Sequence, residues 1–340
     1  DPAYQGEGNL FSIMPDDLNL WDYQRKITLS NSTTKPGYQV QINLDPIVFD
    51  YAHANSSGND IRFYDLQGDK LNYWIQLWNN SGKSILWVNV TSADTSEFLI
   101  FYGNDGALPE SNGNATFPVY FDFETGDDGW EYAESDWQFN GGRDELETNS
   151  QNYVLRVELP YDKNIEAGEY AQYTRYLVDI PEGDYQLVFS ESDNIGLFSS
   201  SSIAKRFFID NDYLYSEYVR DGENPAFNWT EHEIDLTEYS NQSITFRWRL
   251  YLRGEVWDSQ NTIYLDWVYV KRSLEQNISV SIGHEISSDS VQLIGSAIDL
   301  DGEITHYSWN SSLDGVIGTE RNLSIDPDSL SIGIHNITFT

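Results

Sequence analysis

The sequence predicts an all-β protein made of tandem β-sandwiches, and three observations support this prediction. Short segments in which apolar and polar residues alternate with period 2 follow one another along most of the chain. Turn signals rich in Gly, Asn and Pro separate these segments. Aromatic residues, which suit pleated surfaces, make up 15% of the chain. At 340 residues the chain is long enough for two or three domains, each with its own core.

The first expected domain spans residues 20–117 and follows an N-terminal tail, residues 1–19. The tail contains one short apolar patch, from Leu10 to Met14. Turn signals such as Pro36-Gly37 divide the domain into short strands, a spacing typical of a sandwich. The expected strands are YQRKITLSN, YQVQINLD, DIRFYDLQG, YWIQLWNN, SILWVNVT and FLIFYGND.

The second expected domain spans residues 118–273, and the short polar stretch SLEQ links it to the third domain. Its length and the spacing of its strands favour a larger sandwich of jelly-roll type. The strands run from VYFDFETGDDGW through YVLRVEL, EYAQYTRYLVDI, DYQLVFSES, AKRFFIDNDYLYSEYV, NWTEHEIDLT and ITFRWRLYLR to TIYLDWVYVKR.

The third expected domain spans residues 277–340, from NISVSIG to the last residue. It closes with the segment SIGIHNITFT, which alternates as a strand does. Its apolar positions are Ile332, Ile334, Ile337 and Phe339.

The charge balance excludes nucleic acid as a partner. The chain has 19 Lys and Arg against 55 Asp and Glu, which gives a net charge of −36. Affinity for nucleic acid depends on cations that neutralise phosphates, and this chain would repel them. An acidic surface suits solubility, a salty medium or divalent cations.

The sequence also indicates where the protein works. It contains no stretch of 18 apolar residues, so we expect no membrane span. It begins with Asp rather than Met, and we expect a mature N-terminus whose signal peptide has been removed. The chain has no cysteine, so disulfides and thiol nucleophiles are excluded.

Asn-x-Ser/Thr sequons point to the cell surface, because N-glycans require the secretory side of a membrane and an exposed loop. The alternative is that a chain rich in Asn, Ser and Thr contains sequons incidentally. We expect an extracellular glycoprotein. The sequon asparagines are Asn31, Asn55, Asn79, Asn89, Asn114, Asn228, Asn241, Asn277, Asn310, Asn322 and Asn336.

The first domain resembles a known family over residues 20–117. The blocks WDYQRKITLSN, GNDIRFYDLQGDKLNYWIQLWNNSGKSILWVNV and FLIFYGNDGALPESNGNATF keep the order and spacing of the extracellular domain of unknown function 2341. That family occurs in secreted, multidomain surface proteins of archaea and bacteria. The resemblance implies location and architecture, but no chemistry.

The second domain is similar to carbohydrate-binding and concanavalin-like jelly rolls, on the evidence of its opening FDFETGDDGW and its closing IYLDWVYV. In such sandwiches the first and last strands lie close together, and carboxylates there often hold a structural calcium. The matching positions are Asp122, Glu124 and Asp266. Calcium takes six to eight oxygens, so backbone carbonyls would have to complete the site. The alternative is that these are solvated acids at strand ends.

The third domain resembles polycystic-kidney-disease (PKD) and related immunoglobulin-like domains. It carries a D-x-D-G turn (Asp299 to Gly302), a Y-x-W strand (Tyr307 and Trp309) and a G-x-H strand that includes His335. The resemblance implies one more strand after HNITFT. Three explanations for its absence stay open: the sequence is a piece of a longer chain, the strand comes from elsewhere in the chain, or another subunit donates it.

The tail is a candidate donor strand. Alternation in GNLFSIM would place Phe11 and Ile13 on one side of the strand, and Leu10 and Met14 on the other. A tail that enters a neighbouring copy forms a head-to-tail contact, which propagates as a fibre.

No catalytic motif stands out, and we expect neither an enzyme nor a catalytic cofactor. The five histidines are scattered, and the chain contains no His-Glu-x-x-His or Gly-x-Ser-x-Gly sequence. A pair of carboxylates for glycoside hydrolysis cannot be recognised among 55 acids.

Two functions are therefore expected. The first is a structural role at the surface of an archaeal cell, as a pilus-like filament or surface-layer subunit or as the stalk of an adhesin, with copies of itself or other surface proteins as partners. The alternative is a carbohydrate-binding module of an adhesin, in which Trp229 and Trp257 stack on sugars because both lie among turn-like residues. The competing explanation for such aromatics is that they fill the sandwich core.

Overall fold

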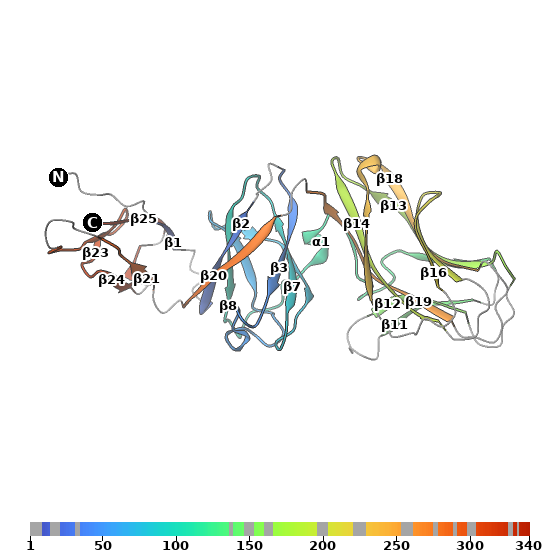
Figure 1. Ribbon diagram of the computed structural model, residues 1–340, viewed down its shortest axis with the longest axis horizontal. Coiled ribbons are helices and arrows are strands. Elements are labelled where there is room, and N and C mark those ends of the chain that lie inside the picture. The colour runs from blue at the N-terminus through green and yellow to red at the C-terminus, as the bar shows by residue number, and fades with distance from the viewer. Residues whose placement is uncertain are drawn as a thin grey trace. The chain divides into compact units, whose positions relative to one another are not determined.

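The computed structural model describes most of the chain as β-strands, which confirms the all-β prediction. It divides into two compact units: residues 1–112 with 276–340, and residues 113–275 (Figure 1). The expected domain boundaries stay a prediction. The structure describes residues 9–13, 21–30, 35–135, 139–145, 153–159, 166–195, 203–219, 229–252, 261–274, 278–287, 291–297, 304–325, 329–331 and 333–340.

The first unit contains a sandwich whose two sheets have the strand orders β20-β2-β8-β4-β5 and β3-β7-β6. Inward positions of these strands, such as Ile27, Ile42 and Phe98, are fully buried between the sheets. The short helix η2, Tyr51–His53, follows β3. The strands are β2 (Tyr23–Ser30), β3 (Tyr38–Leu44), β4 (Arg62–Asp65), β5 (Lys70–Leu71), β6 (Tyr73–Leu77), β7 (Ser84–Val90), β8 (Glu97–Tyr102) and β20 (Ser279–Ser287).

Two sequence blocks of this sandwich contact each other through one buried carboxylate. Asp60, at the start of the D-I-R-F block, is fully buried. Its Oδ2 accepts hydrogen bonds from the backbone N–H groups of Gly103 (2.7 Å) and Asn104 (3.2 Å) in the Y-G-N block. Gly103 has φ +89°, a conformation that favours glycine. The spacing of these two blocks therefore has a structural reason.

Strand β20 follows the second unit in sequence but belongs to the first sandwich. It pairs antiparallel with β2, from Tyr23↔Ser287 to Ser30↔Ser279, and lies beside it in Figure 1 (orange against blue). Residues 279–283, part of the segment expected to open the third domain, therefore extend a sheet of the first sandwich.

A polar network on β20 fixes this pairing. Glu285 Oε2 accepts a hydrogen bond from the Tyr102 hydroxyl (2.6 Å) and lies 3.5 Å from the Arg25 guanidinium. Its Oε1 lies 2.8 Å from His53 Nδ1. Burial, and then the hydrogen bond to Glu285, raises the pKa of the Tyr102 hydroxyl, which therefore remains a donor.

The rest of the first unit forms two small sheets, with strand orders β1-β25-β22-β23 and β21-β24. Trp309 is buried there, its ring centroid 4.4 Å from that of Phe339. His335 is fully buried and is bonded through both ring nitrogens, to Ser311 Oγ (2.7 Å) and to the Ser331 carbonyl (2.6 Å). The strands are β1 (Asn9–Ile13), β21 (Val291–Ile294), β22 (Trp309–Ser311), β23 (Gly315–Gly318), β24 (Asn322–Ile325) and β25 (Gly333–Phe339).

Strand β25, near the end of the chain, has a neighbour on each side. One is β22 and the other is β1, which comes from the N-terminal tail of the same chain. The pairing is antiparallel and continuous, from Asn9↔Ile337 to Ile13↔Gly333. The tail therefore supplies β25 with a neighbouring strand from within the same chain.

The second unit is a sandwich of two larger sheets. One has the strand order β10-β13-β18-β15-β16, and the other has the order β11-β12-β19-β14-β17 with β9 paired to β19. A single core that includes Trp248, Phe207 and Phe189 fills the space between them. The helices α1 (Gly113–Thr116) and η3 (Thr237–Tyr239) are short. The strands are β9 (Val119–Phe121), β10 (Glu131–Glu134), β11 (Asn140–Glu145), β12 (Tyr153–Leu159), β13 (Tyr170–Asp179), β14 (Tyr185–Ile195), β15 (Ile203–Ile209), β16 (Asp212–Val219), β17 (Thr230–Asp235), β18 (Ser243–Leu252) and β19 (Asn261–Arg272).

The network on β20 leads to a stability prediction. Glu285→Ala removes the ion pair and leaves the largely buried Arg25 guanidinium without its carboxylate. We expect a loss of about 2–4 kcal/mol in the free energy of unfolding of the first unit, because a charge left unpaired in a protein interior is costly.

The neighbouring residue on β2 provides the control. Lys26 pairs with Glu97 at 2.9 Å, but its side chain is 52% exposed. Glu97→Ala should cost less than about 1 kcal/mol, as exposed ion pairs do. Urea denaturation of the full chain measures both, and equal losses in the two variants would contradict the importance assigned to Glu285.

Candidate functional site

The three acids predicted to hold calcium come together around one tyrosine. Strand β9 pairs with β19, with Tyr120 opposite Tyr269, so the start and the end of the second unit are adjacent. Burial raises the pKa of the Tyr120 hydroxyl, and the charges of Asp122, Asp266 and Glu124 raise it further. All three carboxylates therefore act on the same hydroxyl group.

A fourth acid, Asp128, joins this cluster and was not predicted. Its Oδ2 accepts hydrogen bonds from the backbone N–H groups of Asp122 (3.0 Å) and Phe123 (2.8 Å). Burial, and then the charge of Asp122, raises the pKa of Asp128; burial and nearby acids do the same for Glu124. In the part of the chain that is described, no group of three or more His, Asp or Glu has an arrangement suited to a metal ion. The calcium site stays a prediction.

The other predicted site residues are dispersed. Trp229 is half-buried and directly precedes β17, whereas Trp257 lies outside the described residues. In the tail, Leu10, Phe11 and Ile13 belong to β1, and Met14 lies outside the described residues.

The sequon asparagines differ in their exposure. Four are exposed, namely Asn114, Asn241, Asn322 and Asn336, and four are half-buried, namely Asn55, Asn79, Asn89 and Asn310. Asn31, Asn228 and Asn277 lie outside the described residues. Glycosylation therefore stays a prediction.

The outer face of the sheet β10-β13-β18-β15-β16 carries a set of residues that sequence analysis did not single out. Because Phe246, Trp248 and Leu250 of β18 point into the core, the residues between them point outward. The strand registers align these outward residues across β13, β18 and β15. We call this surface the arginine face; it consists of Tyr170, Gln172, Thr174, Arg206, Phe208, Tyr213, Arg247, Arg249 and Tyr251.

The arginines of this face lie on aromatic rings. The Arg249 guanidinium carbon is 4.0 Å from the ring centroid of Tyr170 and 4.7 Å from that of Phe208. Arg206 lies 4.1 Å from the Tyr251 ring and 5.4 Å from the Tyr213 ring. Such contacts hold each guanidinium between two aromatic rings, and a guanidinium placed in this way can still donate hydrogen bonds from its edge.

Hydrogen bonding fixes one of these arginines further. Gln172 Oε1 accepts from Arg249 Nε at 2.8 Å and from Arg249 Nη2 at 2.6 Å. Tyr213, at the edge of the face, is 61% exposed, whereas Phe208 beneath the arginines is 6% exposed. The face thus combines an accessible ring, fixed planar cations and an amide on a rigid sheet.

A second polar cluster lies inside the sandwich. Lys205 Nζ contacts Glu191 Oε1 and Asp193 Oδ2, both at 2.7 Å. His232 Nε2 and the Tyr215 hydroxyl each lie 3.1 Å from the same Glu191 oxygen. The charges of Glu191 and Asp193 raise the pKa of Lys205 in spite of its burial. Glu191 is only 1% exposed and Lys205 only 4%, so this cluster joins the two sheets rather than facing a ligand.

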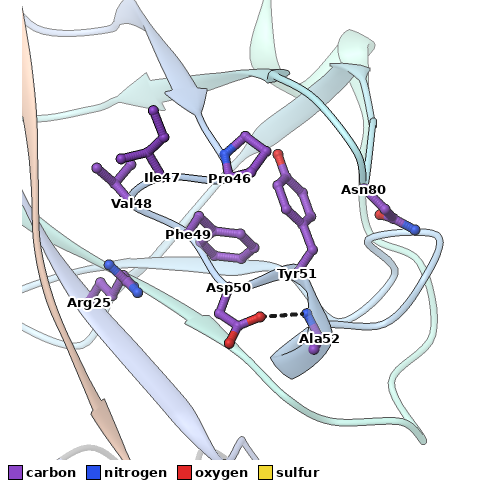
Figure 2. Close-up of a pocket in the computed structure, with 9 residues that line it drawn as sticks. All are labelled: Arg25, Pro46, Ile47, Val48, Phe49, Asp50, Tyr51, Ala52 and Asn80. Atoms are coloured by element: carbon purple, nitrogen blue, oxygen red, sulfur yellow. Dashed lines mark hydrogen bonds between the residues drawn. The ribbon is translucent and has the colours of Figure 1, made fainter.

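The first unit contains a pocket of about 530 Å³ beside the loop that follows β3. Its lining includes Ile47, Val48, Phe49 and Tyr51, and Figure 2 shows Arg25 and Asn80 on opposite sides of these residues. Asp50 accepts a hydrogen bond from the Ala52 N–H and caps η2. The Arg25 guanidinium is already engaged by Tyr102, Gly283 and Glu285, so the pocket gains no cation from it.

Within the described residues, no helix has the length and apolarity needed to cross a membrane. No curated protein matches the chain. The model of the family described as domain of unknown function (DUF2341) matches residues 57–140. The resemblance to that family is thus supported over part of the expected range, residues 57–117, and extends beyond its end. The PKD-like resemblance stays a prediction.

Solved structures similar to this chain include TmCBM61 in complex with β-1,4-galactotriose (17% identity, 45% of this chain and 94% of that chain covered, TM-score 0.31). Another is the K1 cleaved adhesin domain of Lys-gingipain from Porphyromonas gingivalis W83 (14%, 46% and 98%, 0.33). A third is CBM27-1 of Caldicellulosiruptor saccharolyticus in complex with mannohexaose (17%, 45% and 96%, 0.32). All three TM-scores lie below 0.5, so inferences about function depend on this chain's own residues.

Proposed function

We propose that this chain is an extracellular, glycosylated surface protein of archaeal type that binds glycans through the arginine face of its second unit. The observation that supports the proposal is the combination of rings, planar cations and an amide on one open sheet face. The expected carbohydrate-binding module is thus retained, with a different set of residues from Trp229 and Trp257.

The chemistry of sugars explains why such a face suits them. A pyranose presents C–H groups on its faces and hydroxyls at its edge. The exposed Tyr213 ring offers an apolar surface, and the guanidinium edges of Arg206 and Arg249 offer donors for hydroxyls, with Arg249 held in place by Gln172. Because a sheet holds these groups and rings fix the guanidiniums, little side-chain entropy is lost on binding.

A second role, self-assembly, is favoured by one specific observation. The N-terminal strand β1 pairs along its whole length with β25, and the two are separated by most of the chain. A strand that completes a sheet from such a distance can do the same in another copy, since the backbone hydrogen bonds are identical. We propose that exchange of β1 between copies builds the filament or surface layer, which presents the arginine face. Other surface proteins are the alternative partners.

We also propose a structural calcium ion beside Asp122, Glu124 and Asp266. It is supported by the raised pKa values of Glu124 and Asp128, which burial and then neighbouring acids cause, because an added cation would favour the charged form of each carboxylate. No proposed role requires a catalytic cofactor or an enzyme activity.

The glycan proposal predicts the effect of one ring. Tyr213→Ala should weaken glycan binding about 10-fold or more, because the exposed stacking surface is lost. A glycan array followed by calorimetry on the best ligand measures this effect. Trp229→Ala is the matched control on the other sheet and should leave affinity unchanged. Loss of binding in Trp229→Ala alone would assign the site to Trp229 and contradict the arginine face.

The self-assembly proposal predicts complementation by a peptide. A chain that lacks residues 1–15 should be monomeric and should bind a synthetic peptide of residues 6–16, because the edge of β25 is then open. Fluorescence anisotropy of the labelled peptide measures binding. The same peptide with Phe11→Pro is the control, since proline cannot donate to the ladder. Assemblies that survive the deletion unchanged would refute strand exchange.

The calcium proposal predicts a thermal shift. Millimolar Ca²⁺ should raise the Tm of the second unit by several degrees relative to the protein in a chelator, as linkage to a bound ion requires. Asp122→Asn should abolish the shift. An identical Tm with calcium and with chelator would show that these acids are solvated strand-end residues.

A further inference from the structure

Two arginines of the arginine face lie directly opposite each other on adjacent strands. Arg206 of β15 pairs in register with Arg249 of β18, and Arg247 is the next outward residue on β18. Like charges in directly opposite positions destabilise a sheet. Burial, and then the positive charges of Arg247 and Arg206, lowers the pKa of the Arg249 guanidinium, as such crowding requires.

The crowding is notable in a chain with 55 acids and only 19 Lys and Arg. Among the residues that the structure describes, none of the three arginines forms an ion pair with a carboxylate. Acids do lie at the edges of the arginine face. Glu131 of β10 pairs with Thr174 at one edge, and Asp210 and Asp212 lie at the turn between β15 and β16. Elsewhere among the described residues of the unit, Arg156 contacts Asp144 at 2.6 Å and Lys271 pairs with Glu233, whereas Arg143 and Arg175 bond to backbone carbonyls.

Arg206 also retains an unused donor. Its Nε is buried and has no hydrogen-bond partner among the residues that the structure describes, although buried donors in proteins are nearly always satisfied. On β18, opposite Arg206, the Nε and Nη2 atoms of Arg249 bond to Gln172, and its other terminal nitrogen forms no hydrogen bond with the described residues. The guanidiniums on β15 and β18 thus offer hydrogen-bond donors and positive charge, which suit a planar anion that accepts hydrogen bonds.

We infer that the arginine face binds acidic glycans, with a uronate carboxylate placed across Arg206 and Arg249. This inference rests on the proposed glycan binding and names its ligand class. A carboxylate matches the planar fork of a guanidinium, and it removes the repulsion between the two arginines when it binds. The neighbouring sugar ring then reaches Tyr213, whose ring lies 5.4 Å from Arg206.

The net charge of −36 adds selectivity. Polyanions without the right geometry are repelled by the acidic surface, so attraction is confined to the short range of the face. A ligand must therefore combine a carboxylate with a sugar ring. A polyanion that lacks a sugar ring, such as polyglutamate, should not bind.

The test uses the full chain and three uronate polymers of different ring geometry: polygalacturonate, alginate and hyaluronan. We expect saturable binding of at least one, measured by calorimetry, and binding at least about 10-fold weaker once its carboxyls are esterified. Polyglutamate and dextran sulfate are the anionic controls. Equal affinity for the ester would overturn the uronate inference and leave the glycan proposal intact. Absence of binding to these polymers and to every glycan of a neutral array would overturn both.

Variants locate the site. Arg206→Gln and Arg249→Gln should each weaken uronate binding about 10- to 100-fold, whereas Lys271→Gln, an equal charge change on the other sheet, should not. Arg206→Lys keeps the charge but loses the fork, and it should bind nearly as weakly as Arg206→Gln. Full affinity in Arg206→Lys, or stronger binding of dextran sulfate than of any uronate, would overturn the assignment.

Thermal unfolding separates this role from a structural one. Removal of one of two facing charges should leave Tm unchanged within about 4 °C or raise it, because the repulsion is relieved. A large fall in Tm in Arg206→Gln, together with unaltered uronate binding, would identify Arg206 as a structural residue and overturn the inference.

Discussion

The fold depends on strand pairing between segments that lie far apart in the sequence. A sheet edge left open exposes unpaired N–H and C=O groups and invites association with other chains. Strand β20 adds to one sheet of the first unit from beyond residue 275, and β1 adds to another from the N-terminal tail. In the sequence, the second unit is inserted between the two segments of the first. The sheets of the first unit are therefore complete only when both of its segments are present. Such non-local closure is slow, because loop entropy is lost before the contacts form.

Local features of this fold could be predicted from the sequence, and its long-range pairing could not. Alternation in SITFRWRLYL identifies β18 and its inward residues without reference to any other strand. The pairing of β9 with β19 was also expected, since resemblance to jelly rolls places the first and last strands together. For β20, alternation is equally compatible with either neighbouring sheet. In its observed place, Glu285 contacts Tyr102 and His53, and these long-range contacts have no signature in one sequence.

In the candidate site, too, local features could be predicted from the sequence and contacts between strands could not. Trp229 and Trp257 attracted attention because they lie among turn-like residues, although aromatics on a flat sheet face serve sugars as well. The arginine face did have a sequence signal: Arg247 and Arg249 alternate with core residues in an otherwise acidic chain. A net charge averages over the whole surface and conceals such a local excess of cations. The position of Arg206 opposite Arg249 depends on strand register, which the sequence of neither strand specifies alone.

Stability and recognition make opposite demands on the same residues. At the buried Lys205 cluster, the cation is neutralised by Glu191 and Asp193, which is the arrangement that favours a stable interior. On the arginine face, cations are stacked on rings and face one another without carboxylates among the described residues. The chain has acids in excess, so this difference does not come from a shortage of partners. Cations left unpaired while rings hold them in place are costly to folding and favourable to an anionic ligand, which then supplies the missing charge.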